Sequence, residues 1–94
     1  MPDDNEAEVY FRQLLIETKL RIIKIIRNNG GKMAQDILLG QLHEFIAVNP
    51  GLARMARDSY EDAWLFVFGA LIQLMSEGTI IFDEENKKYS IKAE

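Results

Sequence analysis

The residues able to do chemistry are few, and their spacing does not favour catalysis. His43 is the single histidine and no cysteine is present. A metal site on a helix needs a second ligand three or four residues away, but Leu39, Ile46 and Ala47 stand at those positions. A single histidine and no cysteine also leave little from which to build a nucleophile with its base. We therefore expect His43 to be an exposed structural residue and the chain to use no metal or other cofactor.

Two further motifs have ordinary interpretations. Adjacent acids occur at Asp3-Asp4, Glu61-Asp62 and Glu84-Glu85. Such neighbours point to different sides of a helix or strand, so they are typical of solvated turns and not of paired catalytic acids. The segment Gly30-Gly31-Lys32 lacks the upstream glycine and the following hydroxyl of a phosphate-binding loop, and a helical pattern precedes it instead of a strand. These motifs predict no enzyme.

Length and composition limit the organisation to one small domain. The chain has 94 residues, 48% of them hydrophobic and 28% charged, values typical of a globular protein. The longest stretch without a charge, Ala63 to Ser76, has 14 residues, short of the roughly 20 that span a bilayer. The acidic amino end does not resemble a signal peptide. We expect no membrane contact and a cytoplasmic location.

The charges are distributed unevenly along the chain. Residues 9–32 contain six basic residues against Glu17 alone, although the net charge of the chain is −4. Residues 58–86 contain seven acidic residues and no Lys or Arg. This asymmetry is the feature of the sequence that most constrains the choice of partner.

Helical spacing of apolar residues organises the first half of the chain. Residues 1–8 are predicted to be a flexible acidic tail before a single domain at 9–94. A first helix is expected from Val9 to Asn28, closed by Asn29, Gly30 and Gly31, and a second from Ala34 to Val48. The apolar face of the first helix is wider than one core needs. It is either packed on two sides within the monomer or in contact with another chain.

The third main helix has a clear start and end. Ser59 with Asp62 three residues later resembles a capping box, and Gly78 is the expected stop. Trp64 is expected at the centre of the core, where its replacement by alanine would cost about 3 to 5 kcal/mol. The preceding segment, residues 49–58, is either a turn or a short helix capped by Asn49.

A β-hairpin is predicted over residues 79–92. Asp83 is placed opposite Lys88 in an ion pair, so that Phe82 faces Tyr89 and Ile80 faces Ile91 on one apolar side of the ribbon. The sequence thus predicts an α+β fold, mostly α, with three main helices followed by a C-terminal β-hairpin wing.

This order of elements resembles the winged-helix variant of the helix-turn-helix fold. The resemblance is carried by Leu71, Leu74, Met75, Glu77, Gly78, Thr79 and Ile80, followed by Tyr89 and Ile91. It covers residues 9–92 as a hydrophobic skeleton, most specifically 63–91, and implies a short first strand near Lys32 and Met33. Ten residues separate the second and third helices, where the family usually has a tight turn.

The acidic charge of the third helix argues against DNA binding, which is the family's usual function. DNA-reading members place the third helix in the major groove and often add basic residues from the wing. Here the third helix and the first part of the wing lie in residues 58–86, whose seven acids and lack of Lys or Arg would repel a phosphate backbone. The resemblance therefore implies a winged-helix-like domain whose docking surface is acidic and apolar.

Two functions remain as expectations. The first is a non-catalytic protein-interaction domain, a homodimer or an adaptor or subunit of a larger assembly, because the first helix, the third helix and the ribbon have more apolar surface than a monomer covers. Its candidate interface is Ile16, Leu20, Ile23, Leu65, Phe66 and Ile72. The alternative is a DNA-binding transcriptional regulator with an unusual basic surface. Its candidate contacts are Arg21, Lys24, Arg27, Lys32, Arg54 and Arg57.

Overall fold

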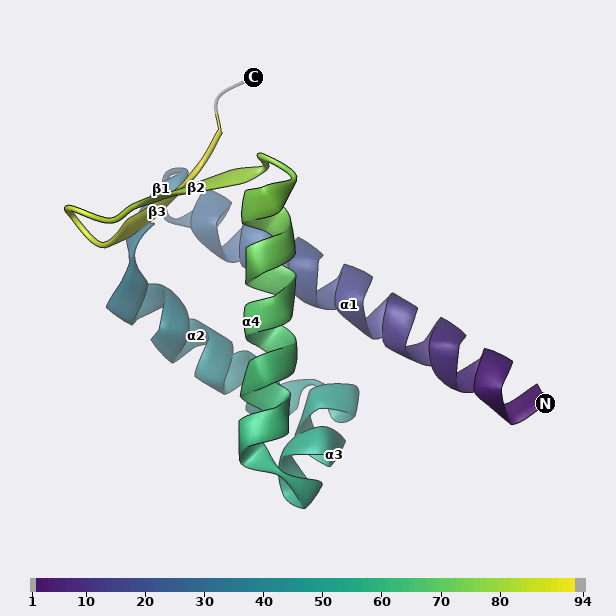
Figure 1. The fold of residues 1–94 in the computed structure, drawn as a ribbon. Helices are drawn as coiled ribbons and strands as arrows, with labels where there is room; N and C mark the ends of the chain where they lie inside the picture. Colours follow the sequence, from purple (N-terminus) through teal and green to yellow (C-terminus); the bar gives the residue numbers. More distant parts are fainter. Residues whose placement is uncertain (1, 93–94) are drawn as a thin grey trace.

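Most of the chain is helical, and a small sheet joins a strand between α1 and α2 to the two strands that follow α4 (Figure 1). This computed structural model describes residues 2–92, with the surroundings of side chains from Glu6 onward. The elements are α1 (Pro2–Asn28), β1 (Lys32–Ala34), α2 (Gln35–Val48), α3 (Pro50–Asp58), α4 (Tyr60–Ser76), β2 (Ile80–Asp83) and β3 (Lys88–Ile91). The strands form an antiparallel sheet in the order β1-β3-β2. The predicted class is confirmed: the fold is α+β, mostly α, with a winged-helix-like layout.

The first helix is longer than its sequence predicted. It begins at Pro2, so residues 2–8, predicted as a flexible tail, belong to α1. Ala7, Glu6 and Glu8 are good helix formers, and the apolar periodicity on which the prediction depended does not register them. The amino-terminal turns of α1 extend past the other helices (Figure 1).

Glycines end α1 where the sequence placed its stop. Gly30 and Gly31 have φ angles of 83° and 84°, and the Gly31 N–H donates to the Ile26 carbonyl at 2.9 Å. A backbone with positive φ favours glycine and satisfies the last carbonyls of a helix. The glycine pair before Lys32 therefore closes a helix. Lys32 and Met33 then supply the first strand, as the resemblance implied, and α2 begins at Gln35, one residue after the predicted start.

The segment between α2 and α4 is a helix, so the second of the two interpretations is confirmed. Asn49 caps α3, because its side-chain oxygen accepts from the Leu52 N–H at 3.0 Å, and Pro50 occupies the first turn. Leu52 is fully buried and fixes this helix to the core. The ten residues therefore replace a tight turn with an added helix that packs on both α2 and α4.

Helix α4 begins and ends as predicted. The Ser59 hydroxyl accepts from the Asp62 N–H at 3.2 Å, which satisfies one of the free donors of the first turn. After the helix, Gly78 adopts a φ of 79° and the Thr79 N–H donates to the Leu74 carbonyl at 2.9 Å. The helix end thus leads directly into β2.

The register of the β2–β3 hairpin is the predicted one. Phe82 pairs with Tyr89 and Ile80 with Ile91, and the two rings lie 4.6 Å apart between centroids. The side chains on this face are buried or half-buried, whereas Ile81 on the opposite face is exposed. A half-buried ribbon needs this alternation.

The predicted ion pair between Asp83 and Lys88 is wrong, although the two residues are register partners. The Asp83 carboxylate instead accepts from the side chain of Asn86 at 2.8 Å and from the N–H groups of Glu85 and Asn86. These bonds, the Asn86 side chain first, lower the pKa of Asp83 below its ordinary 3.8. Three donors within three residues hold the carboxylate over its own turn, so Lys88 stays exposed.

One hydrophobic cluster receives side chains from every helix and from the sheet. Its largest fully buried hydrophobic members are Ile22, Ile26, Leu38, Leu42, Ile46, Leu52, Val67, Leu74 and Ile80. Trp64 is a correction to the sequence analysis, because it is half-buried at the edge of this cluster. The small residues Ala63 and Ala70 occupy the core face of α4 instead and allow its neighbours to approach closely.

Candidate protein-interaction surface

Helix α4 carries a stripe of exposed apolar side chains. Leu65 is 60% exposed, Phe68 37% and Ile72 59%. They stand at positions i, i+3 and i+7, so they share one face of the helix, about opposite Ala63, Val67 and Ala70 in the core. We call these three residues the α4 stripe.

Gly69 lies within the continuous helix α4, beside the α4 stripe. Apart from its two chain neighbours and the backbone of its own helix, a Cβ atom built on Gly69 would meet nothing within 4 Å, so packing against other elements does not explain the residue. A glycine inside a helix costs roughly 0.5–1 kcal/mol relative to alanine. At this position the glycine leaves a shallow place on the helix surface next to the exposed Phe68.

The surroundings of the α4 stripe are polar and acidic. Glu61 lies one turn before Leu65 and Ser76 one turn after Ile72, and both are exposed. No Lys or Arg occurs in residues 58–86. The surface therefore combines exposed apolar area with negative charge, a combination that suits a protein partner better than a phosphate backbone.

A second apolar stripe lies on α1. Ile16 is 52% and Leu20 60% exposed, and both face away from the buried line of Leu14, Thr18 and Ile22. We call Ile16 and Leu20 the α1 stripe. Its charge environment differs from the one on α4, because the exposed Arg12 and Lys24 each lie one turn from it, although the exposed Glu17 lies three residues before Leu20.

Some residues of the predicted interface are exposed to solvent and others are half-buried. The exposed ones are Ile16, Leu20, Leu65 and Ile72. Ile23 and Phe66 are half-buried against the core, and the Phe66 ring lies 6.4 Å from that of Phe11, where α1 meets α4. Phe68 was not among the candidate interface residues that the sequence analysis named. Its spacing of three and four residues from Leu65 and Ile72 is the signal that identifies it.

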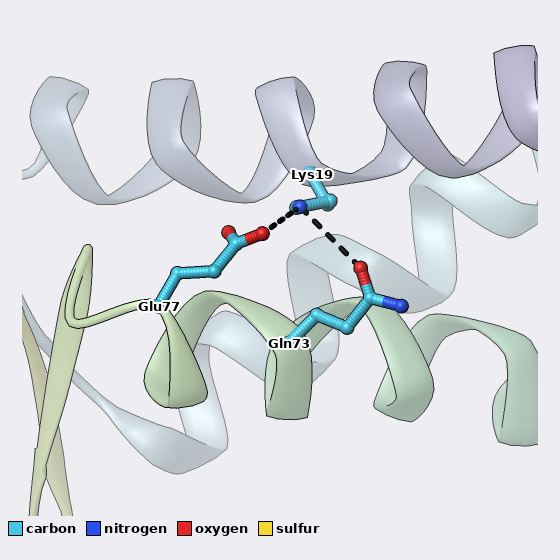
Figure 2. Close-up of polar contacts among 3 residues, drawn as sticks. All are labelled: Lys19, Gln73 and Glu77. Atoms are coloured by element: carbon cyan, nitrogen blue, oxygen red, sulfur yellow. Dashed lines mark hydrogen bonds and ion pairs between the residues drawn. The ribbon is translucent and has the colours of Figure 1, made fainter.

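A polar contact joins the basic helix to the acidic one (Figure 2). The Lys19 ammonium donates to the Glu77 carboxylate at 2.7 Å and to the Gln73 side-chain oxygen at 3.4 Å. Lys19 is half-buried, and its charge is paired with Glu77 of the same chain. This contact helps to set α1 against the carboxyl end of α4.

The basic residues proposed as nucleic-acid contacts are distributed over several parts of the surface. Arg21 and Lys24 line one shallow groove on α1, where the Arg21 guanidinium lies 5.1 Å from the centre of the Phe45 ring. Arg57 lines a different pocket, beside His43 and Tyr60. Arg27 is in the last turn of α1, Lys32 is in β1, and Arg54 is exposed on α3.

His43 takes part in an aromatic cluster. Its Nδ1 atom is hydrogen-bonded to the Tyr60 hydroxyl, and its ring is stacked on Trp64 with centroids 6.5 Å apart and planes 16° apart. The side chain is exposed, as expected from the sequence. Among the residues whose side chains are described, no three His, Cys, Asp or Glu are grouped as metal ligands would be.

Within the described part of the chain, no helix has both the length and the apolar character needed to cross a membrane. Comparison of the sequence and structure with protein-family models, curated proteins and solved structures finds no match. The surface must therefore be interpreted from its own geometry and charge.

Proposed function

We propose that this chain is a non-catalytic, winged-helix-like protein-interaction domain that works as a homodimer or as an adaptor or subunit of a larger assembly. The observation that carries the proposal is the exposed α4 stripe of Leu65, Phe68 and Ile72 within a segment that has seven acids and no cation. We also expect a cytoplasmic location, in keeping with a chain that has no cysteine for disulfides.

Electrostatics favours a protein over DNA at this surface. Cations that neutralise phosphates supply much of the affinity of a DNA complex, and each contact releases counterions. Helix α4 would instead bring the carboxylates of Glu61 and Asp62 toward the duplex, whereas the hairpin turn is mixed in charge, because Glu84 and Glu85 are followed by Lys87. Exposed leucine and isoleucine gain little from a phosphate backbone, but they are stabilised by burial against apolar side chains.

The absence of catalysis is part of the proposal and is supported by how the reactive groups are used. His43 is engaged by Tyr60 and Trp64, and Asp83 organises its own turn. The sequence contains no cysteine nucleophile.

The experiment compares two pairs of exposed apolar residues. Leu65→Asp with Ile72→Asp changes the α4 stripe, and Ile37→Asp with Val48→Asp makes the same change on α2, where both side chains are also exposed. Tagged protein should capture its partner, a second copy included, from an extract of the native host. We expect the α4 variant to lose this capture and the α2 variant to keep it. Equal capture by both variants, or none by the unchanged protein, would reject the proposal.

The second candidate function is DNA binding through Arg21 and Lys24, which is favoured by their shared groove on α1. It requires a salt-dependent mobility shift of random duplex DNA that weakens when both residues are replaced by glutamate. The absence of a shift at low salt would reject this candidate.

A further inference from the structure

We propose that a second site, apart from the α4 stripe, binds an aliphatic monocarboxylate in a hollow between α2 and α3, with the hydrocarbon group inside the hollow and the carboxylate on Arg57. The hollow has a volume of about 230 Å³, opens to solvent and is bordered by Tyr60, the first residue of α4. Neither Leu65, Phe68 nor Ile72 lines it, so the inference goes beyond the proposed function and does not depend on it.

Small side chains leave the space free. Ala47 on α2 and Ala53 and Ala56 on α3 line the hollow, together with Ile46 of the core cluster. The lining is almost wholly apolar, so water inside it finds few hydrogen-bond partners. An apolar group that displaces such water is stabilised by its own burial. The interior of the hollow therefore favours a hydrocarbon group.

The size of the hollow limits the length of that group. Sites that enclose a whole drug-sized ligand have volumes of roughly 300–1,000 Å³. The hollow between α2 and α3, at about 230 Å³, is smaller. It fits one branched aliphatic group, such as the isobutyl group of a leucine side chain, and the rest of the ligand must lie at the mouth.

A cation lies at the mouth of the hollow. Arg57 lines the hollow and is exposed, so its methylene stem can follow the apolar wall while the guanidinium stays in water. Among the side chains that the structure describes, the ion pairs join Arg12 to Glu8 and Lys19 to Glu77, and neither uses Arg57. A planar guanidinium presents paired donors that match the two oxygens of a carboxylate. The charged end of the ligand is therefore a carboxylate.

The acids near Arg57 argue against phosphate as the ligand. Asp58 follows Arg57 directly, Glu61 lies four residues after it, and both are exposed. Their charges oppose the attraction that Arg57 exerts on an anion, and the apolar lining offers a phosphate little further hydrogen bonding. An aliphatic carboxylate needs less from the charges, because burial of its hydrocarbon group supplies part of the affinity.

A hydrogen bond between two helices fixes one wall of the hollow. His43 of α2 and Tyr60 of α4 both line it, and the His43 Nδ1 atom is hydrogen-bonded to the Tyr60 hydroxyl. Trp64 supports this wall, since its ring is stacked on His43. A wall that is held before the ligand arrives reduces the loss of side-chain freedom on binding.

The first measurement is an amide NMR titration of the full chain with isovalerate. We expect the amides of His43, Ala47, Ala56 and Arg57 to shift with a dissociation constant on the order of 1 mM, because so small a ligand makes few contacts. Isovaleramide has the same shape and no charge, and it should bind about tenfold more weakly, since a charge-assisted hydrogen bond is lost. Inorganic phosphate should shift none of these amides. No shift with isovalerate, or equal binding of the amide or of phosphate, would overturn the inference.

Two pairs of variants test the two parts of the site. Arg57→Gln should weaken isovalerate binding about tenfold, whereas Arg54→Gln changes an exposed arginine of the same helix that does not line the hollow and should have no effect. Ala47→Leu should abolish binding because the added side chain fills the hollow. Ala7→Leu is its control, since both alanines are exposed on helices. Circular dichroism verifies that the variants fold. Equal binding by the two members of either pair would overturn the inference.

The same chemistry is offered by a free acid and by the C-terminal residue of a polypeptide that ends in leucine. Titration with acetyl-glycyl-glycyl-leucine beside isovalerate distinguishes the two sources. A dissociation constant about tenfold lower for the peptide would support the site with a polypeptide end as its ligand, and equal values would support it with a free acid. Failure of both probes to bind would overturn it.

The double variant Leu65→Asp with Ile72→Asp separates this inference from the proposed function. It should bind isovalerate as the unchanged chain does, because neither residue lines the hollow. A chain that binds isovalerate through Arg57 but captures no protein would support the site and reject the proposed function. Loss of isovalerate binding in the double variant would contradict a site apart from the α4 stripe.

Discussion

The outward faces of α1 and α4 are alike in shape and opposite in charge. Each carries a stripe of exposed aliphatic residues at helical spacing, Ile16 and Leu20 on α1 and Leu65 and Ile72 on α4. The α1 stripe lies in a segment with six basic residues and one acid, and the α4 stripe lies in a segment with seven acids and no Lys or Arg. Exposed apolar area alone thus indicates that a helix has a free face, whereas the charges around it decide which class of partner the face can accept.

The largest expected effect separates the two faces of α4. Leu74→Ala should lower the free energy of unfolding by about 2–5 kcal/mol, because Leu74 is buried in the core and leaves a cavity. Ile72→Ala should change the stability of the monomer by less than about 0.5 kcal/mol, since Ile72 is exposed. Urea unfolding at low protein concentration measures both values. Similar losses for the two variants would mean that the stripe is covered within the monomer.

Trp64→Ala should have an intermediate effect. The side chain is half-buried at the edge of the core, so the loss should be about 1–2 kcal/mol, less than the cost of roughly 3 to 5 kcal/mol for a fully buried tryptophan. The same unfolding experiment provides the measurement. A loss above about 3 kcal/mol would place Trp64 in the centre of the core, as the sequence analysis expected.

The link between the two helices should contribute less again. A double-mutant cycle with Lys19→Met and Glu77→Gln should give a coupling of about 0.5–1 kcal/mol that decreases with added salt. The exposed pair of Glu8 and Arg12 at 3.2 Å within α1 is the control, with about 0.3–0.5 kcal/mol expected. Equal coupling energies in both pairs would show that the Lys19–Glu77 contact stabilises the fold no more than an exposed ion pair within one helix.

The smallest expected effect concerns Asp83 at the tip of the hairpin. Hydrogen bonds from Asn86 keep its folded-state pKa below 3.8, so its contribution to stability is present above pH 3.8 and is lost as the pH falls through the lower folded-state value. Asp83→Asn should therefore be slightly less stable than the unchanged chain at pH 6, and the difference should shrink near pH 3. Unfolding midpoints at the two pH values test this. A difference that stays constant would contradict the hydrogen-bonded turn.

The sequence predicted those features that depend on neighbouring residues. Ser59 with Asp62 identified the start of α4, and the alternation of Ile80, Phe82, Tyr89 and Ile91 determined the hairpin register, because capping and pleating are local rules. Asp83 was misassigned because donors in its own turn competed with a partner across the ribbon. A pairwise rule for facing strands does not include that competition.

The candidate surface was only partly predictable. Leu65 and Ile72 were named as interface residues, whereas Phe68 was not. Phe66 was named although it packs near Phe11. Which side of an almost wholly apolar helix is covered depends on where α1, α2 and α3 lie, and the periodicity of one helix does not contain that information.

Amide NMR spectra of the full chain, recorded at increasing protein concentration and then with random duplex DNA at low salt, test the central claim most directly. We predict that the amides of Leu65, Phe68, Gly69 and Ile72 shift as the protein is concentrated and do not respond to DNA. Spectra that are independent of concentration, with α4 amides that shift when DNA is added, would contradict the claim that this acidic, apolar face binds protein.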